Sequence, residues 1–185
     1  TGSENFSVSS DGTVTLASAL DYETATAYEI TLTASDGDNT VSETLTINVG
    51  DINEAPTVTT SLAAESVAED AATGTTVATS SASDPESSSI SYSLSGTGSD
   101  NFSVDANGNV TVASSLDYET TTSYTITLTA SDGTNSTQET ITINVSDVDE
   151  FALALSSTSP AINEGVSTGT QVATSTLTQQ DSASV

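Results

Sequence analysis

Four short strings of residues occur twice in the chain at one fixed interval, and this repeat sets the size of the folding unit. The strings are NFSV at Asn5 and Asn101, LDYET at Leu20 and Leu116, ASDG at Ala34 and Ala130, and TINV at Thr46 and Thr142. Both members of each pair stand 96 residues apart. A longer string, VAEDAATGTTVAT from Val67, returns in altered form as INEGVSTGTQVAT from Ile162. Such internal similarity indicates one structural unit copied along the chain.

The repeat divides the 185 residues into three parts. Residues 1–54 correspond to the later part of a repeat, residues 55–149 to one complete repeat, and residues 150–185 to the beginning of a further one. They are called here the first, complete and third repeats. A unit of about 95 residues is the size of one small domain. The sequence therefore predicts one whole domain with part of a domain on each side.

Apolar and polar residues alternate within the repeat, which is typical of half-buried strands. AYEITLTAS, residues 27–35, places Tyr28, Ile30 and Leu32 on one face, and residues 123–131 repeat the pattern. The same alternation occurs in seven further segments. These are residues 43–49, 139–145 and 89–94, and the shorter pairs 6–8 with 14–16 and 102–104 with 110–112. No segment has a sustained helical period.

Turn sequences such as SSDG, DANGN and SDGTN separate these segments. About seven short strands in a unit of this size predict an all-β fold, an immunoglobulin-like Greek-key β-sandwich. Asp11 and Asp105 fall in such turns, and we interpret them as turn residues because Asp commonly binds its own backbone there.

The chain has 26 acidic residues and no Lys, Arg or His, so its carboxylates have no side-chain cation to pair with. The acids gather at turns and strand ends, where like charges repel each other unless a cation lies between them. Oxygen ligands without His or Cys favour calcium over zinc or copper. The residues therefore predict Ca²⁺ as the partner of these clusters.

The composition also excludes several functions. A phosphate backbone or an anionic membrane surface is bound by Lys and Arg, which the chain lacks, so neither nucleic acid nor membrane is an expected partner. No apolar run is long enough to insert into a bilayer. Without His, Cys, Lys or Arg, acid–base chemistry rests on carboxylates and tyrosines alone, and we predict that the chain is not an enzyme.

The ordered motifs resemble those of the cadherin repeat over essentially the full chain. They are the segment 66–96, then LDYE, then LTASDG, then DINEAP or DVDE. The resemblance implies tandem cadherin-like domains whose acidic motifs meet at the junction between repeats and bind calcium there. It also implies an extracellular location.

At the first junction, the resemblance implies ligands from the first repeat, from the complete repeat and from the segment DINEAP, residues 51–56, which is called here the first linker. They are Asp21 and Glu23 of LDYE, Asp51, Asn53 and Glu54 of the linker with the backbone carbonyl of Ile52, Asp84 and Glu86 of DPE, and Asp132 of ASDG. The chain departs from the usual family pattern at Glu54, Ala55 and Glu86.

At the second junction, the resemblance implies a matching set: Glu69, Asp117, Glu119, Asp147, Asp149 and Glu150. Asp181 is the expected downstream partner of these acids. Asp36 is not expected to be a ligand, because the junction that it would serve lies upstream of residue 1.

The preferred interpretation is an extracellular spacer, stiffened by calcium, within a long bacterial or archaeal surface adhesin. The neighbouring repeats of the same chain are then its partners. One alternative is a filament in which the incomplete repeats of separate, identical chains complete each other by strand addition. Another is a linker of the same fold that does not depend on calcium.

Overall fold

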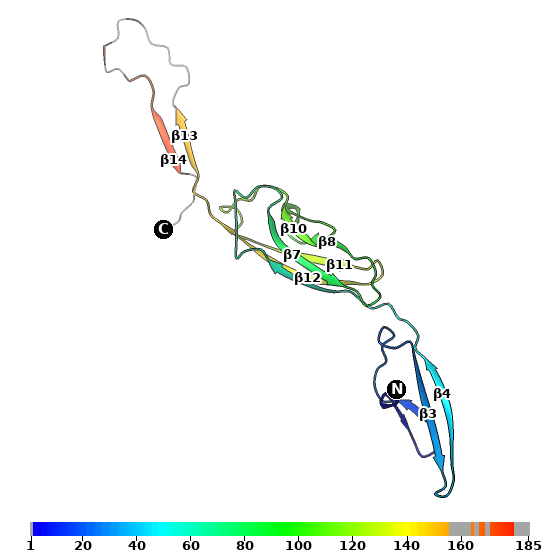
Figure 1. Ribbon diagram of the computed structural model, residues 1–185. Helices are drawn as coiled ribbons and strands as arrows, with labels where there is room; N and C mark the ends of the chain where they lie inside the picture. The colour runs from blue at the N-terminus through cyan, green and yellow to red at the C-terminus, as the bar shows by residue number, and fades with distance from the viewer. Residues whose placement is uncertain (1, 156–163, 165–166, 169–170, 180–185) are drawn as a thin grey trace.

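The computed structural model describes residues 2–155, 164, 167–168 and 171–179. Strands make up most of the regular structure, and Figure 1 shows three β-rich parts that follow one another along the chain. The only helices in these residues are two short 3-10 turns, Ser3–Asn5 and Ser99–Asn101. No helix among them is long and apolar enough to cross a membrane.

The complete repeat is a sandwich of two four-stranded sheets, as the alternating pattern predicts. One sheet has the order β5-β7-β10-β9, and the other has the order β6-β12-β11-β8. The strands of the first sheet are β5 (Thr57–Leu62), β7 (Thr76–Ser83), β10 (Asn109–Val112) and β9 (Phe102–Val104). Those of the second are β6 (Val67–Ala68), β12 (Ser136–Ser146), β11 (Ser123–Ser131) and β8 (Ser91–Ser95).

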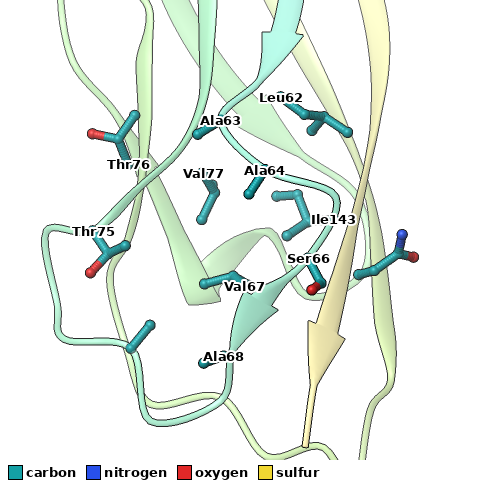
Figure 2. A pocket seen from close by; sticks show the side chains of 12 residues that line it. Leu62, Ala63, Ala64, Ser66, Val67, Ala68, Thr75, Thr76, Val77 and Ile143 are labelled. Atoms are coloured by element: carbon teal, nitrogen blue, oxygen red, sulfur yellow. The ribbon is translucent and has the colours of Figure 1, made fainter.

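The repeat has eight strand segments rather than about seven, because its first strand is shared between the two sheets. β5 pairs antiparallel with β7, and the chain then crosses to the other sheet, where β6 pairs parallel with β12. Small residues occupy the crossing, and a mainly apolar pocket of about 260 Å³ lies beneath it (Figure 2). Asn144 donates a hydrogen bond to the carbonyl of Glu65 (3.1 Å) and so ties the crossing to β12.

The inward faces of both sheets form the core of the complete repeat. Ile126 and Leu128 of β11 and Val110 of β10 are fully buried. Phe102 packs edge-to-face on Tyr124 with ring centroids 5.3 Å apart, and Phe6 makes the same contact with Tyr28 in the first repeat (5.6 Å). This core holds the ends of the strands, and therefore the acidic loops, in fixed positions.

The first repeat has the later strands only, in two separate pairs. They are β1 (Phe6–Val8) with β2 (Val14–Leu16), and β3 (Ala27–Ser35) with β4 (Thr40–Asn48). Leu16 is 61% exposed and Leu45 is 41% exposed, whereas the residues 96 positions later, Val112 and Ile141, are 1% and 3% exposed. The apolar face of the first repeat thus lacks the covering layer that the complete repeat provides.

The described part of the third repeat contains β13 (Phe151–Leu155) and β14 (Ser175–Gln179), which pair antiparallel as β5 and β7 do. The acid predicted to serve this side of the second junction, Asp181, lies outside the described residues.

Candidate cation sites at the repeat junctions

Three carboxyl groups from three different segments meet at the first junction. Glu23 ends the LDYE motif of the first repeat, Glu54 lies in the linker, and Glu86 lies in the loop between β7 and β8 of the complete repeat. One oxygen of each lies within 4.8 Å of an oxygen of the other two. Calcium–oxygen distances are about 2.3–2.6 Å, so two ligands on opposite sides of one ion stand about 5 Å apart. The spacing of this triad therefore fits a single calcium ion.

The carboxyl oxygens around Glu86 lack the donors that buried oxygens normally have. Asp84 Oδ1 accepts a hydrogen bond from the amide of Ser88 (3.0 Å). Asp84 Oδ2 and both oxygens of Glu86 are inaccessible to solvent and accept no hydrogen bond of normal geometry from the described residues. Glu86 can share a proton with the Glu54 carboxyl, which is the largest influence on its pKa. Such orphaned oxygens are the second feature that fits a cation.

The pKa of Glu86 reflects the same crowding. The hydrogen bond with the Glu54 carboxyl, partial burial, and the negative charges of Glu54 and Asp84 raise the pKa of Glu86 to about 7. Without a cation, a proton is therefore the species that relieves the repulsion at neutral pH.

A hydrogen-bonded group lies beside this triad. Asn53 of the linker donates from Nδ2 to Asp132 Oδ2 (2.7 Å), and Asn135 donates from Nδ2 to the carbonyl of Asn53 (2.7 Å). Asp132 Oδ1 accepts the backbone amides of Thr134 and Asn135, both at 2.6 Å. The bond from Asn53, followed by the backbone amides, lowers the pKa of Asp132. These contacts join the linker to the hairpin between β11 and β12.

The other residues predicted for the first junction stand outside the triad. Asp21 Oδ1 accepts the amide of Thr24 (2.9 Å), which lowers its pKa and closes a turn. Asp51 and Ile52 are exposed. Asp11 and Asp105 bind backbone amides within their own turns, as their interpretation as turn residues requires. Asp36 does the same with Asp38 and Asn39.

A second triad lies at the other end of the complete repeat. It consists of Glu69, which follows β6, Glu119 of the second LDYE motif, and Asp147, and their oxygens also lie within 4.8 Å of one another. Glu69 is only 5% exposed and accepts the amides of Tyr118 (2.7 Å) and Val148 (2.8 Å). Glu69 therefore fixes the start of the second linker, the segment DVDE at residues 147–150, to the complete repeat.

The charge around this triad also shifts a pKa. The pKa of Glu119 is raised: its own backbone amide opposes the shift, but partial burial and the charges of Glu69, Asp147 and Asp117 outweigh it. Asp117 and Glu150 line an open depression of about 370 Å³ beside Glu69 and Glu119, whereas Asp149 is exposed and outside the triad.

The sequence did not indicate Asn135, the residue that holds the linker carbonyl. Asn39 occupies the same position of the preceding hairpin, where its backbone amide closes the same turn. The two turn sequences, SDGDN and SDGTN, differ only at Asp38 and Thr134. The different role of Asn135 comes from the linker, whose Asn53 carbonyl accepts its side-chain amide.

A model of the cadherin domain family matches residues 64–146, which lie within the complete repeat. Comparison with curated proteins found no match. Among solved structures, extracellular cadherin domains 3–6 of protocadherin gamma B2 align with 95% of this chain at TM-score 0.62 and 23% identity, which reflects the fold. Domains 1–4 of protocadherin gamma B7 align with 96% of it at TM-score 0.55 and 29% identity.

Human protocadherin-24 domains 1–2 align with 80% of this chain and 79% of their own length, at TM-score 0.57 and 27% identity. The chain spans under half the length of the two gamma-protocadherin structures, 45% and 47%. The fold of the complete repeat is therefore that of a cadherin repeat.

Proposed function

We propose that this chain is an extracellular, non-catalytic spacer in which calcium ions at the repeat junctions stiffen a tandem array. The observation that carries the proposal is the triad Glu23, Glu54 and Glu86, which takes one carboxyl from each repeat and one from the linker. An ion held by all three would tie both repeats to the linker. The orphaned oxygens of Asp84 and Glu86 support the same site.

The ligands that we propose follow from this geometry. Glu23, Glu54 and Glu86 would hold an ion at the first junction, with Asp84 beside it, and Glu69, Glu119 and Asp147 would begin a site at the second. Bound calcium would supply positive charge to a chain of formal charge −26 and so reduce its self-repulsion. Asp21, Ile52, Asp51 and the remaining predicted ligands would need a change of rotamer or of loop position to join. A surface adhesin of a bacterium or archaeon remains our proposal for the parent protein.

Thermal unfolding in millimolar calcium and in excess chelator tests the calcium proposal. An ion that binds only the folded chain stabilises it by mass action and so raises Tm. At an ion concentration 100 times its Kd, the free energy of unfolding rises by about 2.7 kcal/mol. Magnesium is the control, because it requires a smaller and more regular octahedral site. A rise with calcium alone is expected, while equal Tm values in calcium and chelator would favour the linker that does not depend on calcium.

A second candidate is a filament in which separate chains complete each other. The exposed apolar face of the first repeat favours it: a depression of about 620 Å³ there is lined by Val8, Leu32 and Val41 among others. The hairpin β13–β14 of another chain corresponds to β5–β7, strands of the covering layer. Light scattering across a range of protein concentrations tests this candidate, which requires a mass that grows with concentration.

A further inference from the structure

We propose that Asn53, Asp132 and Asn135 form a latch that holds the first linker on the complete repeat when no metal is bound. The proposal concerns the metal-free chain, so it does not depend on calcium binding at the neighbouring triad. The latch consists of two side-chain bonds between the linker and the β11–β12 hairpin, each 2.7 Å long.

The NH₂ group of Asn53 and both oxygens of Asp132 have hydrogen-bond partners in the latch. Asn53 Nδ2 donates to both Asp132 Oδ2 and the carbonyl of Glu54 (3.0 Å), so its orientation is fixed by two acceptors. Asp132 is held in place by two backbone amides on its other oxygen. A bond between an amide and an ionised carboxylate is stronger than one between neutral groups. In the latch, N–H donors stabilise the negative charge of Asp132 in place of a cation.

The latch changes where a metal-free array bends. Glu69 fixes the linker after the complete repeat through the amide of Val148, and the latch fixes the linker before it. The complete repeat then carries both linkers with it. At the first junction, the remaining freedom lies between the linker and the first repeat, on the Glu23 side.

The second junction lacks the residue that such a latch needs. Asp149 stands 96 positions after Asn53 and has two oxygens where Asn53 has an oxygen and an NH₂ group. It cannot donate to a downstream carboxylate when it is ionised. The metal-free latch is therefore specific to the first junction.

Distance measurements between spin labels in excess chelator test the latch in the full chain. The chain has no Cys, so Cys at Ile52, which is 75% exposed, and at the exposed Thr140 of β12 would take both labels uniquely. A docked linker gives one narrow distance distribution. Asn135→Ala removes the bond to the Asn53 carbonyl but keeps the backbone amide that closes the turn. On the order of a fivefold to tenfold increase in undocked linker is expected.

Asn39→Ala is the matched control, because Asn39 occupies the same turn position in the first repeat and binds Asp36 in the same way. It should leave the distribution narrow. Asn53→Ala should broaden it as Asn135→Ala does. A broad distribution in the unmutated chain, or a narrow one in both Asn53→Ala and Asn135→Ala, would overturn the latch. Because the experiment contains no calcium, its failure leaves the calcium proposal untouched.

Discussion

Single residues decide whether each acid cluster repels itself or holds a ligand. Glu86 has a Glu side chain where the resembling family usually has Asp, and the longer side chain reaches Glu54 and Glu23. Glu69 differs from Glu86 because two backbone amides already stabilise its charge. Carboxylates of the two triads can therefore respond to mutation in opposite directions.

Glu86→Gln should raise Tm in chelator and reduce the rise that calcium causes. The change removes one of the charges that repel each other at the first junction, and it also removes a charged ligand. Calcium affinity at this site is expected to fall on the order of tenfold. Titration calorimetry measures it, with the exposed Glu43→Gln on β4 as the control. Unchanged calcium affinity in Glu86→Gln would exclude the triad as the site.

Glu69→Gln should destabilise the complete repeat even without metal. A Gln amide accepts through one oxygen only, so its NH₂ would face either the Tyr118 or the Val148 amide, and a buried N–H without an acceptor costs about 1–3 kcal/mol. Glu119→Gln, in the same triad, loses charge without losing these two bonds. Denaturant unfolding in chelator should therefore separate the two variants, and an equal effect of both would contradict this role of Glu69.

The metal-free chain should become more stable as the pH falls from 8 to 5. The folded pKa of Glu86 is about 7, above its ordinary value of 4.5, so the folded state binds more protons in this window and stability declines as pH rises through it. The raised pKa of Glu119 acts in the same direction. Below about pH 4 the trend reverses, because the lowered pKa values of Asp21, Asp36 and Asp132 favour the ionised fold.

Tm measured in chelator across this pH range checks the prediction. In calcium, Tm should instead fall as the pH is lowered from 8 to 5, because protons compete with the metal for the same carboxylates. A metal-free chain that loses stability between pH 8 and pH 5 would contradict the crowding of the first triad.

At the scale of the strand, the alternating pattern predicted most of the fold. β3 and β11 occupy the predicted residues 27–35 and 123–131, and β9 occupies the predicted 102–104. β12 begins at Ser136, three residues before the predicted start, because hairpin pairing with β11 continues through polar residues. The division of the first strand into β5 and β6 left no mark in the alternation, because small residues at the crossing carry little pattern.

The candidate site was less predictable than the fold. The motifs indicated which acids gather near a junction, but the selection of Glu23, Glu54 and Glu86 depends on how the linker turns between two repeats. Asn53 and Asp132 were predicted as metal ligands, and in the structure Asn53 donates a hydrogen bond directly to Asp132. Side-chain contacts of this kind arise between segments 79 residues apart, so no local pattern records them.

Gly108→Ala should destabilise the complete repeat far more than Gly12→Ala affects the first. Both glycines close equivalent turns with positive φ, 82° and 88°. A Cβ at Gly108 would overlap the Ser80 carbonyl oxygen of β7, whereas one at Gly12 meets no atom within 4 Å. The left-handed conformation alone costs about 1–2 kcal/mol, and the clash adds to it. Chemical denaturation of both variants measures the difference, and equal losses would contradict the close packing of this turn.

At the scale of the whole molecule, the structure places acid clusters at both ends of one well-packed sandwich. The complete repeat is rigid because of its core, so the reach of a tandem array depends on its junctions. Negative charges spread along the chain repel each other and favour an extended array. Cations at the junctions would also fix the orientation of each repeat relative to the next.

The measurement that tests the central claim most directly is the distance between spin labels across the first junction. Cys at Thr44 of β4 and at Thr140 of β12, both exposed, would report the first and complete repeats. In chelator the distribution should be broad, because the Glu23 side of the junction is not latched. Calcium should narrow it to one distance in the unmutated chain, and Glu86→Gln should require more calcium. A distribution of the same width with and without calcium would contradict calcium stiffening of the junction.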